Sequence, residues 1–461
     1  MANDWEVVKF KELYLIPSRN GLSKPKKVRG EGVKFINMGE IFKFDRMFNI
    51  PTDRVPVNKK EFDSSELRNN DLLFARQSLV LSGAGKCAIF LGDNEPVVFE
   101  SHLIRVRPDE KKVYSEYLYY FFKSPQGRSE IWSITEQGAG QSGIRGSDLE
   151  NVNVPMPSHQ EQKAIAHILG SLDDKIELNR RMNETLEAMA QALFKSWFVD
   201  FDPVIDNALA AGKPIPDELL DRAEQRKGIE KKDSPDIQNL FPNEFEFTEE
   251  MGWIPKGWVN EPLSSFIEKS NTGADAIQKA PIVDYDTGIK CARIGDFSNN
   301  RDIASWGFSN VTAENFEKFK LLKGDILITR TSILGLSKII LEDLSAVYNN
   351  GLIRIRVNTN PIYVYQAFQT KEFRTYIDRI TGESSTRPNM KISYLLEYPL
   401  LHPSTKLLKK ASNIFSDSLV KRKELDLQVE IISKLRDTLL PKLISGELRI
   451  SDAAALVDEA I

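Results

Sequence analysis

Cysteine and histidine are scarce in this sequence. Its 461 residues include two cysteines, Cys87 and Cys291, and four histidines. The cysteines lie in different halves of the chain and neither belongs to a Cys-x-x-Cys pair, so their spacing predicts no disulfide framework and no structural zinc site. No histidine is accompanied by a plausible nucleophile and orienting residue. We therefore expect neither a metal site nor a catalytic residue in this chain.

Long apolar runs are absent as well. No stretch approaches the 18 or more apolar residues that a membrane span requires, and the first 15 residues carry acidic side chains and no signal-peptide core. The hydrophobic content of 41% is ordinary for a globular protein. These features predict a cytoplasmic protein without membrane contact.

Complete catalytic motifs are also missing. SGAGKC (82–87) resembles a phosphate-binding loop, but Val80 stands in place of its first glycine and Cys87 in place of its serine or threonine. NPIY (360–363) resembles an amino-methyltransferase motif but has Ile362 in place of a proline. A loose nuclease-like pattern that begins at Asp217 lies in an acidic linker and not on predicted strands. The chain is therefore expected not to be an enzyme.

What the sequence does contain is an internal repeat. NDLLFARQS (70–78) returns 254 residues later as GDILITRTS (324–332), and further pairs follow in the same order with an offset that drifts between 246 and 256. A period this long indicates two whole domains in tandem, because solenoid repeats run at about 20 to 50 residues. The further pairs are FINMGEI (35–41) with CARIGDF (291–297), and VVFESHLIRVR (97–107) with AVYNNGLIRIR (346–356).

Each half begins with short β-branched runs typical of strands and ends with a long helical pattern. From 160 to 198 and from 404 to 440 the sequence has no proline, and apolar residues recur at intervals of three and four. Each helix would be about 55 Å long, longer than its own domain is wide, so we expect the two helices to pack against each other. Asn179 and Asn183 interrupt the first apolar stripe, either as buried residues that set the register or as solvent-facing ones.

These patterns predict an α+β fold with two tandem-duplicated mixed α/β domains, separated by two long antiparallel helices that form a coiled coil about an approximate two-fold axis. Residues 200 to 250 hold 14 acidic and 6 basic residues and several prolines. This composition predicts a linker with one short helix near 216–227. The expected segments are a first domain at 1–158, a helix at 159–199, a linker at 200–252, a second domain at 253–403, a helix at 404–445 and a tail at 446–461.

Residues 154–204 (VPMPSHQEQKAIAHILGSLDDKIELNRRMNETLEAMAQALFKSWFVDFDPV), GWIPKGW (252–258) and LRDTLLPKLISGELRI (435–450) resemble the specificity subunit of type I restriction-modification enzymes. The resemblance covers nearly the whole chain. It implies two target recognition domains that each read one half of a split DNA site, with the helices setting the spacer between the halves. It departs from the family pattern at HPSTKLLKKASNI (402–414), which lacks the "EQ" of the first helix entry.

The resemblance also implies partners. Two modification subunits would bind S-adenosylmethionine and methylate adenine, and restriction subunits that use ATP would join through them. S-adenosylmethionine, ATP and magnesium are accordingly expected in those subunits, and no cofactor is expected in this chain. Two other classes remain open: a two-headed enzyme with unseen active sites, and a coiled-coil adaptor without DNA readout.

Gly-rich polar loops supply the candidate contacts to double-stranded DNA, because glycine permits close approach while Arg and Gln bond in pairs to base edges. The alternative is that these segments are turns at domain ends, with Arg76 or Arg330 paired to a carboxylate. A basic loop at 19–30 could meet phosphates or be an ordinary surface loop. The candidates are Lys26, Lys27, Arg29, Arg76, Gln77, Ser78, Gln141, Ser142 and Arg145 in the first half, and Arg330, Thr331, Ser332, Ser385, Arg387, Asn389 and Lys391 in the second.

Contacts to the modification subunits are expected on the exposed faces of the helices and at their ends. Large aromatic residues at a helix end are poor neighbours for solvent and good interface anchors. They could instead pack on the linker. The candidates are Gln160, Gln162, Lys163, Trp197 and Phe198.

Overall fold

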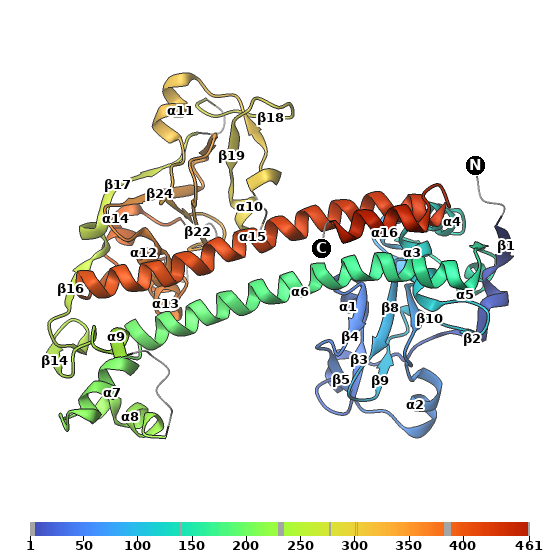
Figure 1. Cartoon of the computed structure of the whole chain (residues 1–461), viewed down its shortest axis with the longest axis horizontal. Helices are drawn as coiled ribbons and strands as arrows, with labels where there is room; N and C mark the ends of the chain where they lie inside the picture. Colours follow the sequence, from blue (N-terminus) through green and yellow to red (C-terminus); the bar gives the residue numbers. More distant parts are fainter. Residues whose placement is uncertain are drawn as a thin grey trace. The chain divides into compact units, whose positions relative to one another are not determined.

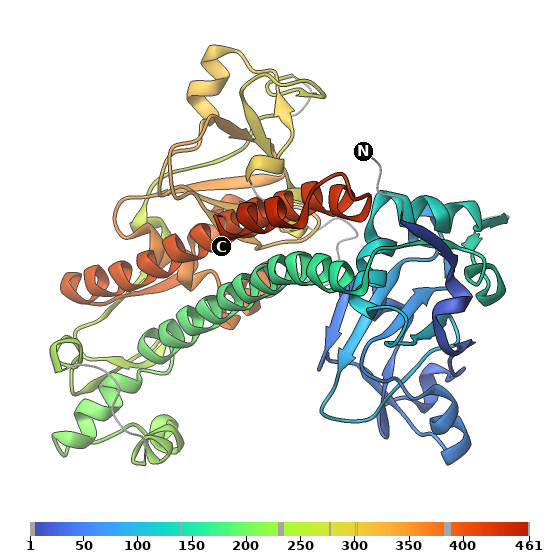
Figure 2. The ribbon, with the colours of Figure 1, turned by 45° about the vertical axis from the view of Figure 1, so that its right-hand side comes forward.

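The structure, a computed structural model, describes residues 5–138, 141–228, 235–275, 278–299, 301, 303–381 and 389–459. The chain divides into two compact units, residues 1–180 with 426–461 and residues 181–425. Both division points fall inside the long helices α6 (His159–Phe198) and α15 (Thr405–Ile444), so each helix contributes to both units (Figures 1 and 2). The units are described one at a time below.

The first unit is built on a mixed sheet with strand order β2-β10-β6-β8-β4. Its centre is β6, the first of the repeated stretches, in which every residue is buried. β6 pairs antiparallel with β8 and β10, whereas β4 pairs parallel with β8. The unit also contains a smaller sheet in the order β5-β3-β9, another in the order β11-β12-β7, and the strand pair β1-β13. The strands are β1 (Glu6–Lys9), β2 (Tyr14–Asn20), β3 (Val33–Ile36), β4 (Arg46–Phe48), β5 (Asp53–Val55), β6 (Asp71–Ala75), β7 (Gln77–Ser78), β8 (Cys87–Gly92), β9 (Val97–Phe99), β10 (Leu103–Pro108), β11 (Glu136–Gly138), β12 (Gln141–Gly143) and β13 (Asn153–Met156).

An aromatic helix covers the main sheet of this unit. Helix α3 has the sequence SEYLYYFFK, and its residues from Tyr117 to Phe122 are buried. The ring of Phe122 lies 4.9 Å from that of Phe74 on β6 and 4.8 Å from that of Phe10, so helix and sheet share one core. The shorter helices are α1 (Met38–Lys43), α2 (Lys59–Ser65), α3 (Ser115–Lys123), α4 (Pro125–Ser133) and α5 (Gly146–Leu149).

Helix α6 enters the first unit through a capping box. The Glu161 side chain accepts hydrogen bonds from the Ser158 backbone N–H and hydroxyl, which satisfies donors that a helix start leaves unpaired. Further along, Asp173 accepts from Arg436 of α15 at 2.6 Å, and Asn179 donates to Gln428 at 3.1 Å. These pairs show antiparallel packing of the two helices within this unit. Asn179 is buried, which agrees with the first of the two alternatives given for it, a buried residue that sets the register.

The C-terminal residues of the first unit, which were predicted to be a tail, form a helix. Helix α16 (Ile450–Asp458) buries Ala453 and Val457 in the same core as β6 and α3. α15 continues through Pro441 to Ile444, one residue before the end expected at 445.

The second unit repeats the strand pairing of the first. Its main sheet has the order β17-β24-β21-β22, in which β21 carries the second copy of the repeated stretch. A second sheet, β18-β20-β19-β23, pairs β19 parallel with β23 as β3 pairs with β9 in the first unit. The strands are β14 (Phe245–Thr248), β15 (Gly252–Pro255), β16 (Val259–Pro262), β17 (Ile267–Thr272), β18 (Ile282–Val283), β19 (Lys290–Ala292), β20 (Phe308–Ser309), β21 (Ile326–Thr329), β22 (Ser337–Ile339), β23 (Ala346–Tyr348), β24 (Leu352–Val357) and β25 (Pro399–His402).

Buried polar contacts recur in the two units as the sequence repeat requires. The fully buried Asp71 accepts two hydrogen bonds from Arg107, and Asp325 accepts the same pair from Arg356. Tyr117 donates to the carbonyl of Pro155 at 2.7 Å, and Tyr363 to that of Leu401 at the same distance. Glycine is required twice in the same place, because a Cβ on Gly21 would lie 2.0 Å from the Phe99 carbonyl oxygen and one on Gly273 2.1 Å from that of Asn349.

The acidic linker is more ordered than the sequence predicted. One short helix was expected near 216–227, where α8 lies, and a further helix, α7, precedes it. Asp202 and Asp206 on α7 each accept two hydrogen bonds from an arginine of α8, Arg222 and Arg226 respectively, so part of the acidic charge is neutralised locally. The remaining helices of this unit are α7 (Asp202–Ala210), α8 (Leu220–Arg226), α9 (Pro235–Gln238), α10 (Ile294–Ser298), α11 (Ala313–Phe319), α12 (Pro361–Ala367), α13 (Lys371–Thr381) and α14 (Ile392–Leu396).

Within the second unit α6 and α15 also run antiparallel. Arg422 donates to Glu187 at 2.9 Å, and the ring of Phe194 lies 6.0 Å from that of Phe415. The described residues contain no helix that is both long and apolar enough for a membrane span. Across the same residues no three His, Cys, Asp or Glu side chains gather closely enough to hold a metal ion. Both cysteines are buried free thiols, and burial raises the pKa of Cys291 to about 12.

Candidate nucleic-acid interface

Two segments that the sequence singled out separately meet at one edge of the first unit. After β6 the chain continues through Arg76 into β7, which pairs antiparallel with β12. Ser78 lies opposite Ser142, and the Ile144 N–H donates to the Arg76 carbonyl at 2.9 Å. β11 adds to the other side of β12. A small polar sheet, β11-β12-β7, therefore projects from the end of the central strand.

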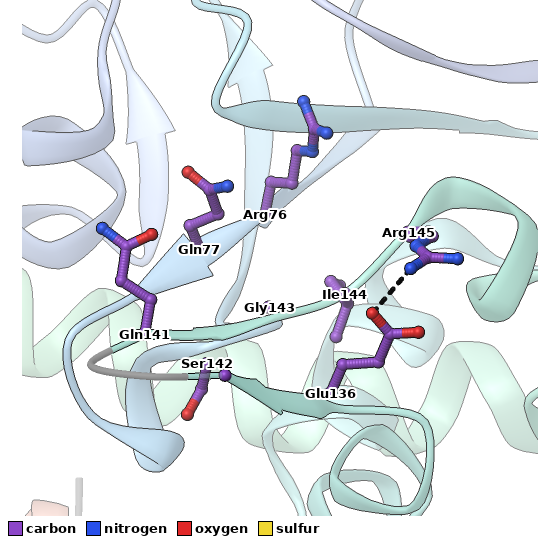
Figure 3. Close-up of a pocket in the computed structure, with 9 residues that line it drawn as sticks. Arg76, Gln77, Glu136, Gln141, Ser142, Gly143, Ile144 and Arg145 are labelled. Carbon is purple, nitrogen blue, oxygen red and sulfur yellow. Dashed lines mark hydrogen bonds and ion pairs between the residues drawn. The ribbon is translucent and has the colours of Figure 1, made fainter.

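This sheet borders an open hollow of about 210 Å³. In Figure 3 the side chains of Gln77 and Gln141 reach out on the same side of the sheet, whereas Ser142 points to the opposite side. Gln141 is exposed and Gln77 half-buried, with the Gln77 Oε1 3.2 Å from Nδ1 of His102. Two neighbouring amides offer donors and acceptors that match an adenine edge in the DNA major groove. The hollow is lined by Arg76, Gln77, Glu136, Gly138, Gln141, Ser142, Gly143, Ile144 and Arg145.

The arginines at the hollow are differently engaged. Arg145 forms a 2.7 Å ion pair with Glu136, but the two side chains are 66% and 63% exposed. A pair this exposed contributes at most about 1 kcal/mol, so a phosphate can replace the carboxylate. Arg76 has no carboxylate partner within the residues that the structure describes. The alternative prediction, that Arg76 pairs with a carboxylate, is therefore not supported.

The second unit builds the same junction. The Met390 N–H donates to the Arg330 carbonyl at 2.8 Å, and Thr331 forms a β-bridge with Asn389, matching the contacts of Arg76 and Gln77 in the first unit. Asn389, Lys391 and Ser332 are exposed. Arg330 has no ion-pair partner in the described ranges either, and its Nε is buried without a hydrogen-bond partner there. The predicted contacts Ser385 and Arg387 lie outside the described residues.

The basic loop of the first unit splits into two parts. Lys26 and Lys27 are exposed on a short 3-10 turn. Arg29 instead forms ion pairs with Asp53 at 3.1 Å and Glu100 at 3.6 Å. Its guanidinium is therefore held by the protein, whereas Lys26 and Lys27 remain exposed to solvent and available to phosphate.

The predicted partner-binding residues fall into two groups as well. Gln160 and Lys163 are exposed near the start of α6. Gln162 is 1% exposed, accepts from the Tyr114 N–H and donates to the Pro157 carbonyl, both at 2.9 Å. It ties the start of the helix to its own domain and is not an exposed anchor.

The prediction that Trp197 and Phe198 are exposed interface anchors is wrong. They are 1% and 4% exposed and lie in the core of the second unit. The Trp197 ring lies 5.3 Å from that of Phe241 in the linker, and the Phe198 ring 5.1 Å from that of Tyr363. Packing on the linker was the alternative prediction, and it holds for Trp197, whereas Phe198 packs on residues of the second domain.

Two arginines that hold the loops after Ser78 and Ser332 were not predicted from the sequence. Arg128 of α4 donates to the carbonyls of Ser82, Ala84 and Gly85, and Arg374 of α13 donates to that of Leu334. The two arginines are separated by 246 residues, an offset of the internal repeat, so extending the repeat alignment into α4 and α13 would have found them.

Comparisons with known proteins agree with this arrangement. Residues 2–188 match the model of the type I restriction modification DNA specificity domain. The specificity subunit of the type I restriction enzyme MjaIX from Methanocaldococcus jannaschii is 25% identical over 459 residues, covering 98% of this chain and 95% of the relative. The HindI specificity subunit from Haemophilus influenzae is 24% identical over 450 residues, covering 90% and 94%.

A solved structure supports the fold. The S subunit of a type I restriction-modification system from M. genitalium superposes with a TM-score of 0.52 over 96% of both chains, at 15% sequence identity. Residues 2–188 match the type I restriction modification DNA specificity domain, and the chain as a whole is similar in sequence to type I restriction enzyme specificity subunits and in fold to a type I S subunit.

Proposed function

We propose that this chain directs a type I restriction-modification complex to a bipartite DNA target, with each compact unit reading one half. As a specificity subunit it is not itself catalytic, and catalysis belongs to other subunits of the complex. The observation that carries the proposal is the junction built twice: in each unit the end of the buried central strand meets a second polar segment through the same backbone hydrogen bond.

The chemistry of these junctions suits DNA. The first presents Gln77, Gln141 and Arg145, and the second presents Thr331, Asn389 and Lys391. Amides can bond in pairs to adenine, and arginine or lysine to guanine or phosphate. The two sets differ in residue type on the same backbone scaffold. Two readers of this kind would recognise two different half-sites.

Helices α6 and α15 would set the spacer between the half-sites and carry the docking surfaces. Each has 40 residues and each takes part in both units. Their exposed faces, including Gln160 and Lys163, are proposed to bind two modification subunits. S-adenosylmethionine, and the ATP and magnesium used by restriction subunits, would reside in those partners.

The test replaces Gln77 and Gln141 together by alanine in the full chain, expressed with its modification subunits. Loss of one amide-to-base pair costs about 1 to 3 kcal/mol, so affinity for the first half-site should fall about fivefold or more while the second half-site is still read. Gln126→Ala is the matched control, because this glutamine is exposed on α4 and does not line the hollow. Affinity can be measured by gel shift on duplexes altered in one half-site at a time.

Two results would contradict the proposal. Equal loss of discrimination at both half-sites would mean that the units do not read independently. Unchanged discrimination in the double variant would mean that this edge does not face the bases.

A further inference from the structure

Three aliphatic residues directly follow β7 of the polar sheet in the first unit. Leu79, Val80 and Leu81 come straight after β7 and are 81%, 59% and 37% exposed. A single exposed leucine needs no explanation. Three in succession, beside the glutamines of the hollow, form an apolar tip, defined here as residues 79–81.

This tip is held in place by the protein. Arg128 donates to three carbonyls of the following residues at 2.9 to 3.1 Å, and the Val80 N–H donates to the Ser78 hydroxyl at 3.2 Å. One residue beyond the tip, after the exposed Ser82, Gly83, Ala84 and Gly85 are buried. The loop is therefore anchored at both ends, and its aliphatic side chains are presented to solvent from a fixed backbone.

The second unit keeps an exposed aliphatic residue at the equivalent place. Ile333 follows Ser332 as Leu79 follows Ser78, and it is 46% exposed, whereas the next residue, Leu334, is 7% exposed. Arg374 holds the Leu334 carbonyl at 2.7 Å, as Arg128 holds the first loop. Ser332 has a φ of 65°, a left-handed conformation that is unfavourable for a residue with a side chain. The strained backbone at Ser332 opposes stability, and Ile333 stands at the position that Leu79 occupies in the first unit, which together favour a role in binding.

We propose that Leu79 and Ile333 each contact the 5-methyl group of a thymine in the half-site that their unit reads. The inference rests on the proposed function and adds an apolar reader to the polar ones. The thymine methyl is the only apolar group that the edges of the four ordinary base pairs present in the major groove. An aliphatic side chain fixed beside amides that face base edges can therefore contact one apolar group, the thymine methyl. This contact distinguishes thymine from cytosine.

The test uses the full chain assembled with its modification subunits and duplexes in which each thymine of the target is replaced in turn by deoxyuridine, which lacks the methyl group. For the wild type, one replacement in each half-site should weaken binding about fourfold, the effect of one buried methyl group. In Leu79→Ala the replacement in one half-site should have no further effect while the other keeps its own. Ile333→Ala should show the reverse.

Leu220→Ala is the control, because Leu220 is a similarly exposed leucine, 45%, on α8 of the linker. It should bind like the wild type, and all three variants should keep the wild-type melting temperature, since surface truncations change stability by less than about 0.5 kcal/mol. Deoxyuridine effects that persist unchanged in Leu79→Ala and Ile333→Ala, or an absence of any such effect in the wild type, would overturn the inference. Failure of the wild type to select any sequence would instead refute the proposed function.

Discussion

Lengthening both long helices should lengthen the gap between the two half-sites. The perturbation inserts seven helical residues after Arg180 and seven after Leu425, the points at which the chain divides into its two units. The contacts Asp173 to Arg436 and Glu187 to Arg422 each lie within one unit and are left intact. Seven residues keep the apolar stripe in phase, because a heptad rotates a straight helix by only about 20°.

The expected change follows from the helix rise. Seven residues add about 10 Å at about 1.5 Å per residue, which corresponds to about three base pairs at about 3.4 Å each. Three base pairs also rotate one half-site by about 100°, because DNA has about 10 to 10.5 base pairs per turn. A complex that contains this variant should therefore methylate DNA more slowly while recognising the same half-sites across a longer gap.

The assay is methylome sequencing of cells that carry the variant with its modification subunits, because this method reports the motif and not the rate. The control inserts the same seven residues after Gly212, an exposed turn of the linker with a φ of 62°. That insertion should leave the gap unchanged. An unchanged gap in the helix variant, or new bases in either half-site, would refute the view that the helices set the spacing.

Two further predictions concern the stability of the second unit. Changing Trp197 and Phe198 together to serine should destabilise this unit by more than about 5 kcal/mol, because each large-to-small change of a buried aromatic costs about 3 to 5 kcal/mol; a melting curve like that of the wild type would contradict their burial. Burial opposes the ionisation of Asp202, but hydrogen bonds from Arg222 and Ser196 lower its pKa. The stability that the ionised carboxylate contributes is therefore present above the ordinary carboxyl pKa near 4 and is lost as the pH falls through the lower pKa of the folded protein. Asp202→Asn should cost about 2 kcal/mol at pH 7 in denaturant titrations and less as the pH approaches 3; a cost independent of pH would contradict this reasoning.

The elements that depend on local pattern could be predicted from the sequence. The repeat located β6 and β21, and the three-and-four spacing located α6 and α15 with starts within one residue of the observed ones. Local signals suffice there because strand alternation, helical periodicity and a capping serine act between neighbours in sequence. Candidate readers on both sides of the polar edges were likewise found from glycine-rich composition.

Which of those residues lie in contact was decided by the tertiary structure. Gln77 and Gln141 are 64 positions apart and meet only because β7 pairs with β12. Trp197 has the same sequence signal as an exposed anchor and is buried because Phe241 of the linker packs on it. Burial is a property of the folded surroundings, and a sequence pattern shows that a side chain is apolar but not which distant segment covers it.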